Sequence, residues 1–282
     1  FAVRSELVQE ADNTIKVDTD LGTLLETSPL AMVGAVQGDE TSTERRMLIS
    51  KLKSHDPNVE AYRMLRTNLR FAAVDDALKS YMVTSPGPSE GKSTTAANLA
   101  IAMAQAGHQT VLVDVDLRRP VQAKTFGVMN SVGLTTAIAD RTVPLFELFH
   151  ATDIDNLTLL GSGQLPPNPS ELVGSQRMKE IVRELESLFD VVILDSPPVL
   201  MVSDSSLLAT HVDGIILVVR ESETTVEAAY RAAEQIRSVK ARLLGTVLNG
   251  VKQRGQGYNY YYYNQYYGGG KGQPRSSGQP VR

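Results

Sequence analysis

The stretch Ser85–Ala100 reads SPGPSEGKSTTAANLA, and it decides the fold. A short apolar run precedes it and an alanine-rich helical pattern follows, so this turn joins a strand to a helix. Backbone N–H groups in such a turn can cradle phosphate, Lys92 can reach the β and γ phosphates, and the Ser93 hydroxyl can ligate Mg²⁺. The pattern predicts a P-loop, although Pro86 occupies the first glycine position of G-x-x-x-x-G-K-[ST]. The alternative is an ordinary strand-to-helix turn.

Short apolar runs alternate with helical patterns on both sides of this turn. Continuous apolar strands separated by helices predict an α/β fold of the P-loop NTPase type, with a doubly wound, mainly parallel sheet flanked by helices. Ligands of such sheets bind at the carboxyl ends of the strands. The predicted strands are Tyr81–Thr84, Thr110–Asp114, Leu157–Leu160, Val191–Asp195, Gly214–Val219 and Leu243–Leu248.

Carboxylates stand at two of the predicted strand ends. Asp114 and Asp116 follow the strand after the P-loop helix, and Asp195 ends the run VVILD. At this edge of the sheet a carboxylate can hold Mg²⁺ directly or through water. A single acid there often caps a helix, which is the interpretation we favour for Asp204. Three acids beside a P-loop favour a site for ATP or GTP with Mg²⁺.

Three segments are expected along the 282 residues. Residues 1–50 are expected to be a linker with little core of its own, although DNTIKVDTDL and SPLAMVGAVQG contain possible short strands. Residues 51–254 should form the P-loop domain, starting with a helix that has Asp56 as N-cap and Pro57 as its first residue. Residues 255–282 cannot bury enough aliphatic surface to offset their ordering entropy, so they should form a flexible tail.

The composition narrows the function classes. A net charge of -4 argues against a protein that coats nucleic acid, and the absence of cysteine excludes disulfides and thiolate metal sites. Four scattered histidines show no metal or triad spacing, so metalloenzyme and hydrolase interpretations lack support. No apolar run approaches the roughly 18–20 residues that cross a bilayer. Because the chain starts with Phe1 rather than Met, we expect a fragment of a longer protein, so any membrane anchor region would lie outside this sequence.

Several segments together resemble the bacterial tyrosine kinases. TVLVDVDLRRP and DVVILDSPPV resemble the Walker A′ and Walker B elements of that family, and Glu60, Arg63 and Arg66 match its E-x-x-R-x-x-R helix. PPNPSELVGS, VSDSSLLATHVDGIILVVR and ARLLGTVLNGV are also similar to family segments. A tyrosine cluster near the C-terminus completes the pattern. The resemblance covers roughly residues 57–267. The preceding DNTIKVDTDL is similar to the stretch that follows the second transmembrane helix of family members, which implies that residues 1–50 are a juxtamembrane linker.

The resemblance implies an ATP- and Mg²⁺-dependent protein-tyrosine kinase and assigns roles to its motif residues. Mg²⁺ would be held by Ser93, Asp114 and Asp195. Asp114 would also belong to the catalytic residues. Lys92 would neutralise the transferring phosphate and Asp116 would accept the phenol proton. Arg118 would contact phosphate or a neighbouring subunit. The expected nucleotide-binding residues are Ser89, Glu90, Gly91, Lys92, Ser93 and Thr94, with Asn249 as a contact to the base.

The stretch YNYYYYNQYY, residues 258–267, would then supply the acceptors, phosphorylated in trans. Each phosphotyrosine adds about -1.5 to -2 charges, so full modification would add roughly ten or more. The resemblance implies a homo-oligomeric ring, an octamer in the family, with Glu60, Arg63 and Arg66 at its contacts. We hypothesise that tail phosphorylation breaks the ring. The expected acceptors are Tyr258, Tyr260, Tyr261, Tyr262, Tyr263, Tyr266 and Tyr267.

The resemblance also implies a cellular setting. The kinase would work at the cytoplasmic face of the bacterial plasma membrane, with a tyrosine phosphatase and the machinery of capsule or exopolysaccharide synthesis and export, without nucleic acid.

Other interpretations stay open at this point. A ParA/MinD-like ATPase would share the fold, but such proteins usually carry a lysine where Gly87 stands. The domain could be a nucleotide-gated scaffold, with phosphorylation secondary. Glu60 and Arg63 could form an intrahelical ion pair of about 0.2–0.5 kcal/mol. The tyrosines could form a low-complexity tail that stacks on sugars or RNA.

Overall fold

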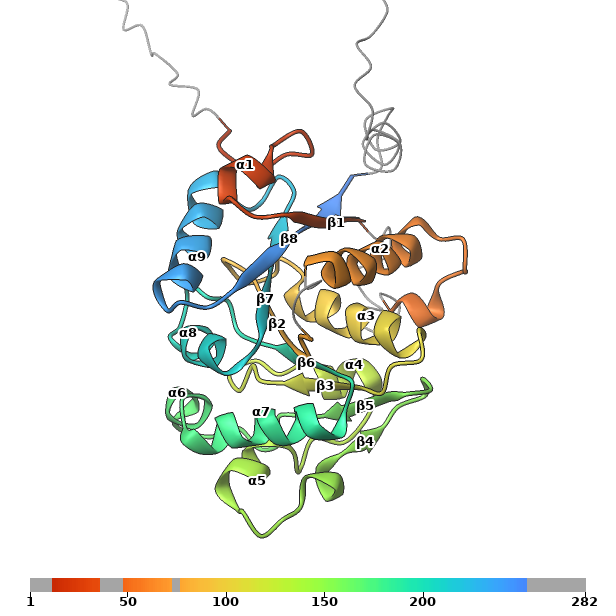
Figure 1. The fold of residues 1–282 in the computed structure, drawn as a ribbon, viewed down its shortest axis with the longest axis vertical. Coiled ribbons are helices and arrows are strands. Elements are labelled where there is room, and N and C mark those ends of the chain that lie inside the picture. The colour runs from red at the N-terminus through yellow and green to blue at the C-terminus, as the bar shows by residue number, and fades with distance from the viewer. Residues whose placement is uncertain (1–11, 36–47, 73–76, 253–282) are drawn as a thin grey trace, which may run out of the picture. The chain divides into compact units, whose positions relative to one another are not determined.

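A computed structural model describes residues 12–35, 48–72 and 77–252 (Figure 1). In this part of the chain one sheet has the strand order β1-β8-β7-β2-β6-β3-β5-β4. Its neighbouring strands are parallel, except that β4 is antiparallel to β5. The strands are β1 Pro29–Gly34, β2 Ser80–Thr84, β3 Thr110–Asp114, β4 His150–Ala151, β5 Leu157–Leu160, β6 Val191–Asp195, β7 Gly214–Arg220 and β8 Leu243–Val251.

The six predicted strands are confirmed, and so is the doubly wound architecture. Helices α2 and α3 lie on one face of the sheet, whereas α7, α8 and α9 lie on the other (Figure 1). The helices are α1 Leu21–Leu25, α2 Pro57–Ala72, α3 Lys92–Ala104, α4 Gln122–Phe126, α5 Leu134–Ala139, α6 Pro169–Val173, α7 Gln176–Leu188, α8 Asp204–Leu208 and α9 Val226–Ser238, with short 3₁₀ turns at Ile49–Lys51, Leu145–Leu148 and Ala209–His211.

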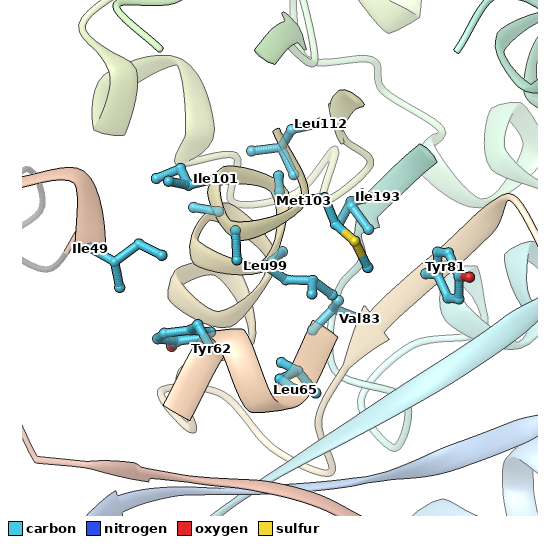
Figure 2. Packing of buried hydrophobic residues seen from close by; sticks show 14 of the residues in the cluster. Ile49, Tyr62, Leu65, Tyr81, Val83, Leu99, Ile101, Met103, Leu112 and Ile193 are labelled. Atoms are coloured by element: carbon cyan, nitrogen blue, oxygen red, sulfur yellow. The ribbon is translucent and has the colours of Figure 1, made fainter. Parts of the chain in front are cut away.

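Helix α2 begins as its sequence predicts. Pro57 is its first residue, and the Asn58 N–H donates to Oδ1 of Asp56 over 2.8 Å, so Asp56 caps the helix. Its apolar stripe, including Tyr62 and Leu65, is buried in the core that α3 shares (Figure 2). Packing against α3 fixes the helix that starts at the predicted P-loop.

The segment before residue 50 corrects one expectation. β1 pairs in parallel with β8, and its Leu30, Ala31 and Val33 are buried, as is Ile15 further upstream. The expectation of little core before residue 51 is therefore wrong, because a six-residue apolar run completes one edge of the sheet. The expected boundary at residue 255 and the tail beyond it lie outside the described residues, so they stay predictions.

Candidate active site

The turn between β2 and α3 is shaped by two residues in the left-handed region. Ser89 has φ 64° and Gly91 has φ 94°, and α3 begins directly afterwards. At the φ of Gly91 any other residue would be strained, and its Cβ would also lie 1.9 Å from Nδ2 of Asn249, so this position favours glycine. Successive N–H groups in such a turn, continued by a helix N-terminus, form an anion-binding concavity.

Parallel register brings the predicted acids to this turn. Asp114 of β3 lies opposite Asp195 of β6, at the carboxyl edge of the sheet. Nζ of Lys92 lies 2.8 Å from Oδ2 of Asp116, 3.5 Å from Oδ1 of Asp195 and 3.1 Å from Oγ of Ser93. The structure thus brings together Lys92, Ser93 and all three acids that the sequence singled out.

Electrostatic strain is concentrated on Asp114. Burial, together with the neighbouring carboxylate of Asp195, raises the pKa of Asp114 to about 8. Burial disfavours the charged form of Lys92, but Asp195 and Asp116 outweigh it and raise the pKa of Lys92 above its usual value. The ammonium group is therefore the positive centre of a site that carries excess negative charge.

One oxygen of each strand-end acid has no hydrogen-bond partner within the described chain. Asp114 accepts the N–H groups of Val121 and Gln122 through Oδ2, and Asp195 accepts from Nε2 of Gln122 through Oδ2. Both buried Oδ1 atoms are left without a hydrogen bond, although Oδ1 of Asp195 lies within ion-pair distance of Lys92. Such oxygens suit a hard cation. In the described part of the chain, no group of three acidic or histidine side chains forms a metal site. Mg²⁺ often takes only one or two carboxylates beside phosphate and water.

Gln122 is a site residue that the sequence did not reveal. Its side chain donates to Asp195 and also to the Ser93 carbonyl, 3.0 Å away, so it links the two halves of the acid cluster. A glutamine early in a helix carries no distinguishing pattern, because its role depends on strands far apart in sequence.

Replacing Asp114 with asparagine is expected to stabilise the ligand-free protein at alkaline pH. The pKa of Asp114 is about 8 in the folded state, against a usual value of 3.8, so its contribution to stability is lost as the pH rises from about 4 through about 8. At pH 8.5 Asp114→Asn should raise the free energy of unfolding by about 1–3 kcal/mol, since each pKa unit corresponds to about 1.4 kcal/mol. Urea unfolding without Mg²⁺ at pH 6 and pH 8.5 measures the difference.

The matched control is Glu184→Gln, which removes an exposed carboxylate on α7. It should leave the pH dependence of stability unchanged. Parallel pH curves for the wild type and Asp114→Asn would contradict the assigned strain.

Two cavities adjoin the loop. One of about 340 Å³ lies between the turn and the strand ends, and Ser89, Gly91, Lys92, Ser93, Thr94 and Asp116 line it. A second, of about 130 Å³, shares Gly91 and Thr94 with the first and is lined by Asn249. The candidate contact to a base therefore lies beside the candidate phosphate site.

Asp204 corrects a second expectation. Ser203, not Asp204, occupies the N-cap position of α8, and the buried Asp204 carboxylate accepts from Nε of Arg118 at 2.9 Å and from Oγ of Ser170 at 2.6 Å. Asp204 as a helix cap is therefore wrong, because the nearby guanidinium offers its buried charge a partner. Arg118 is engaged within its own chain in this structure.

The α2 residues proposed for subunit contacts have different partners within the chain. Nη1 of Arg63 lies 3.3 Å from Oε2 of Glu60, and both side chains are about half exposed. This is the intrahelical pair named above as an alternative. Arg66 donates to the carbonyl of Ala102, 2.9 Å away, which ties α2 to the end of α3. The seven tyrosines lie outside the described residues.

A glycine-bearing turn between strand and helix, with a lysine and strand-end acids on a parallel sheet, defines a nucleotide-binding domain of the P-loop class. The family model of the AAA domain matches residues 88–248. The chain is 40% identical over 228 residues to the tyrosine-protein kinase YwqD of Bacillus subtilis (80% of this chain, 96% of that protein) and 30% identical to the tyrosine-protein kinase CpsD of Streptococcus agalactiae (75% and 91%). The chain belongs to the bacterial tyrosine-protein kinases.

Solved structures agree with this family. The chimerical protein CapA2B2 has a TM-score of 0.76 at 33% identity and covers 83% of this chain and 99% of its own. The kinase domain of the Escherichia coli tyrosine kinase ETK has a TM-score of 0.73 at 28% identity, covering 83% and 95%. The septum site-determining protein MinD of Pyrococcus horikoshii, at 21% identity and a TM-score of 0.53, shares the fold alone. No helix in the described part is long and apolar enough to span a membrane.

Proposed function

We propose that the protein transfers the γ-phosphoryl group of ATP to tyrosine side chains in an Mg²⁺-dependent reaction. The observation that carries the proposal is the placement of Lys92 between Asp116 and Asp195 beside the phosphate loop. Tyrosine as the acceptor is supported by relatives that are named tyrosine-protein kinases.

In this reaction the phenol oxygen bonds to the γ phosphorus, the bond to the β–γ bridging oxygen breaks, and ADP leaves. Lys92 neutralises charge on the transferring group, and Asp116 takes the phenol proton. Ser93, Asp114 and Asp195 would hold Mg²⁺, which supplies further charge neutralisation.

Asp116 is poised by two contacts. Its Oδ1 accepts the Arg119 N–H over 3.0 Å, and its Oδ2 accepts from Lys92 over 2.8 Å. We propose that a bound γ phosphate draws Lys92 away from Oδ2. That oxygen then becomes free to accept a proton, so substrate binding itself would expose the base.

We propose that the acceptors are the tyrosines of residues 258–267, modified in trans by another copy of the chain. Intact-mass spectrometry of the full chain tests this, before and after treatment with a tyrosine phosphatase and again after incubation with ATP and Mg²⁺. A ladder of phosphate-sized increments that maps to these tyrosines is expected. A single unmodified mass throughout would favour the nucleotide-gated scaffold.

The proposed setting is the cytoplasmic face of a bacterial membrane, in an assembly that makes and exports capsule or exopolysaccharide and that includes a tyrosine phosphatase. Its support is the family resemblance. This chain aligns with only 29% of the length of wzc of Salmonella typhimurium, a relative at 32% identity, so related kinase regions occur within longer proteins.

The proposed ring makes a mass prediction. Because phosphorylated tails would repel one another, the dephosphorylated chain should show a several-fold larger mass in static light scattering than the phosphorylated chain. Arg63→Glu should reduce the dephosphorylated chain to the smaller species. Arg70→Glu, an exposed change on the same helix, should leave the assembly intact. An unchanged mass after dephosphorylation would rule out the ring hypothesis.

A further inference from the structure

A buried carboxylate lies inside the phosphate loop. Glu90 is only 6% exposed, its Oε2 accepts the Gly87 N–H at 2.7 Å, and its Oε1 accepts from the Thr224 hydroxyl. A negative charge next to an anion site opposes phosphate binding, so the Glu90 carboxylate must contribute to the loop in another way. Both oxygens are used to brace the turn, which points to a role in holding its shape.

The proton of the Thr224 hydroxyl has a defined direction. Oγ1 of Thr224 accepts the Arg220 N–H at 2.7 Å, and the side chain is 3% exposed. Since this oxygen already accepts the Arg220 N–H, its single proton is available for Glu90, and the hydroxyl donates to Oε1 of Glu90. Removing this hydroxyl therefore leaves Oε1 of the buried Glu90 without the hydrogen bond that Thr224 donates. A buried carboxylate oxygen that loses its donor is destabilised.

The loop backbone is held from the same side of the fold. Nη1 of Arg220 donates to the Ser89 carbonyl at 3.0 Å, and Nδ2 of Asn249 donates to the Glu90 carbonyl at 2.9 Å. Since protein donors hold these carbonyl oxygens, they do not turn toward a bound phosphate. The N–H groups of the turn then keep the orientation that anion binding needs.

The N-terminal segment reaches this support. The Ile15 N–H donates to the Thr224 carbonyl and the Ser222 N–H donates to the Ile15 carbonyl, both at 2.8 Å. Ile15 is fully buried, so these two backbone hydrogen bonds fix the turn of residues 220–224 against the N-terminal segment.

We propose that Thr224 is a positioning residue for nucleotide binding, which acts through Glu90 on the phosphate loop and is itself held by the N-terminal segment at Ile15. The inference rests on the proposed nucleotide binding. It adds a residue outside the P-loop to the determinants of affinity.

Calorimetric titration of the full chain with Mg-ADP tests this. Thr224→Val keeps the shape and removes the hydroxyl, and should weaken binding about tenfold, equivalent to about 1.4 kcal/mol. Thr224→Ser keeps the hydroxyl and should restore affinity to within about twofold of the wild type. In the phosphorylation assay Thr224→Val should raise the KM for ATP by a similar factor, with kcat at saturating ATP changed less than about threefold.

A double-mutant cycle shows whether the effect passes through Glu90. In a Glu90→Met background, Thr224→Val should change affinity less than about twofold, because methionine has a similar length but no oxygen to accept the Thr224 proton. An equal loss in both backgrounds would overturn the proposal. Thr67→Val, which removes an exposed hydroxyl on α2, is the matched control and should bind as the wild type does.

The outcomes separate the two proposals. If the wild type does not bind Mg-ADP, the proposed function fails. If it binds and folded Thr224→Val binds equally well, positioning by Thr224 is wrong. Should Thr224→Val not fold, Thr224→Ala, which leaves room beside the carboxylate, takes its place under the same criteria.

Discussion

Replacing Lys92 with methionine is expected to lower the rate of the proposed tail phosphorylation by about a thousandfold or more, because it would remove the cation that we propose neutralises the transferring phosphoryl group. The substitution keeps a long apolar stem but no charge. Methionine also leaves Asp116 and Asp195 without their shared ammonium, so we expect a lower unfolding temperature in the absence of Mg²⁺. Intact-mass spectrometry after incubation with ATP and Mg²⁺ measures the phosphorylation.

Lys53→Met, an exposed change outside the site, is the matched control and should retain the full phosphate ladder. Circular dichroism must show that Lys92→Met remains folded at the assay temperature. A folded Lys92→Met protein with a wild-type ladder would contradict the role of Lys92.

Replacing Asp116 with asparagine is expected to lower phosphoryl transfer about 10²- to 10⁴-fold, the range typical for loss of a general base. Asparagine preserves the shape and can still accept the Arg119 N–H, but it cannot take the phenol proton. Mg-ADP affinity should stay within a few-fold of the wild type, because the proposed metal ligands and phosphate loop are untouched. Single-turnover transfer to the tail, together with calorimetry, separates the two effects.

This variant also distinguishes a kinase from a nucleotide-gated scaffold. A pure scaffold would keep its function in Asp116→Asn, whereas a kinase would lose its tail phosphate. Glu147→Gln, an exposed carboxylate change, should alter neither property. Unimpaired transfer by Asp116→Asn would require another base.

The fold and the centre of the site were predictable because their signals are local. Each predicted strand is a continuous apolar run, and Asp114 and Asp195 end two such runs that happen to be neighbours in the sheet. The Asp56 cap likewise depends on adjacent residues. These local sequence patterns were enough to predict that the loop and the acids lie at the same edge of the sheet.

The corrections and omissions share a different cause. Thr224 supports Glu90 across 134 positions of sequence, and Gln122 reaches Asp195 across 73. Neither pairing has a sequence pattern, since both depend on how distant strands are ordered. The cap of α8 was assigned to Asp204 because serine and aspartate are both common capping residues. The sequence does not show that Ser203 takes the cap position while the Asp204 carboxylate pairs with Arg118.

The strand β1 has a consequence for the solubility of the domain. Without it, the nine-residue β8 would end the sheet and expose a long row of unpaired N–H and C=O groups, a surface that recruits strands from other molecules. β1 is shorter and begins with Pro29, which has no N–H to offer. A chain cut at residue 51 would therefore lose the strand that shields it from aggregation, together with part of its core.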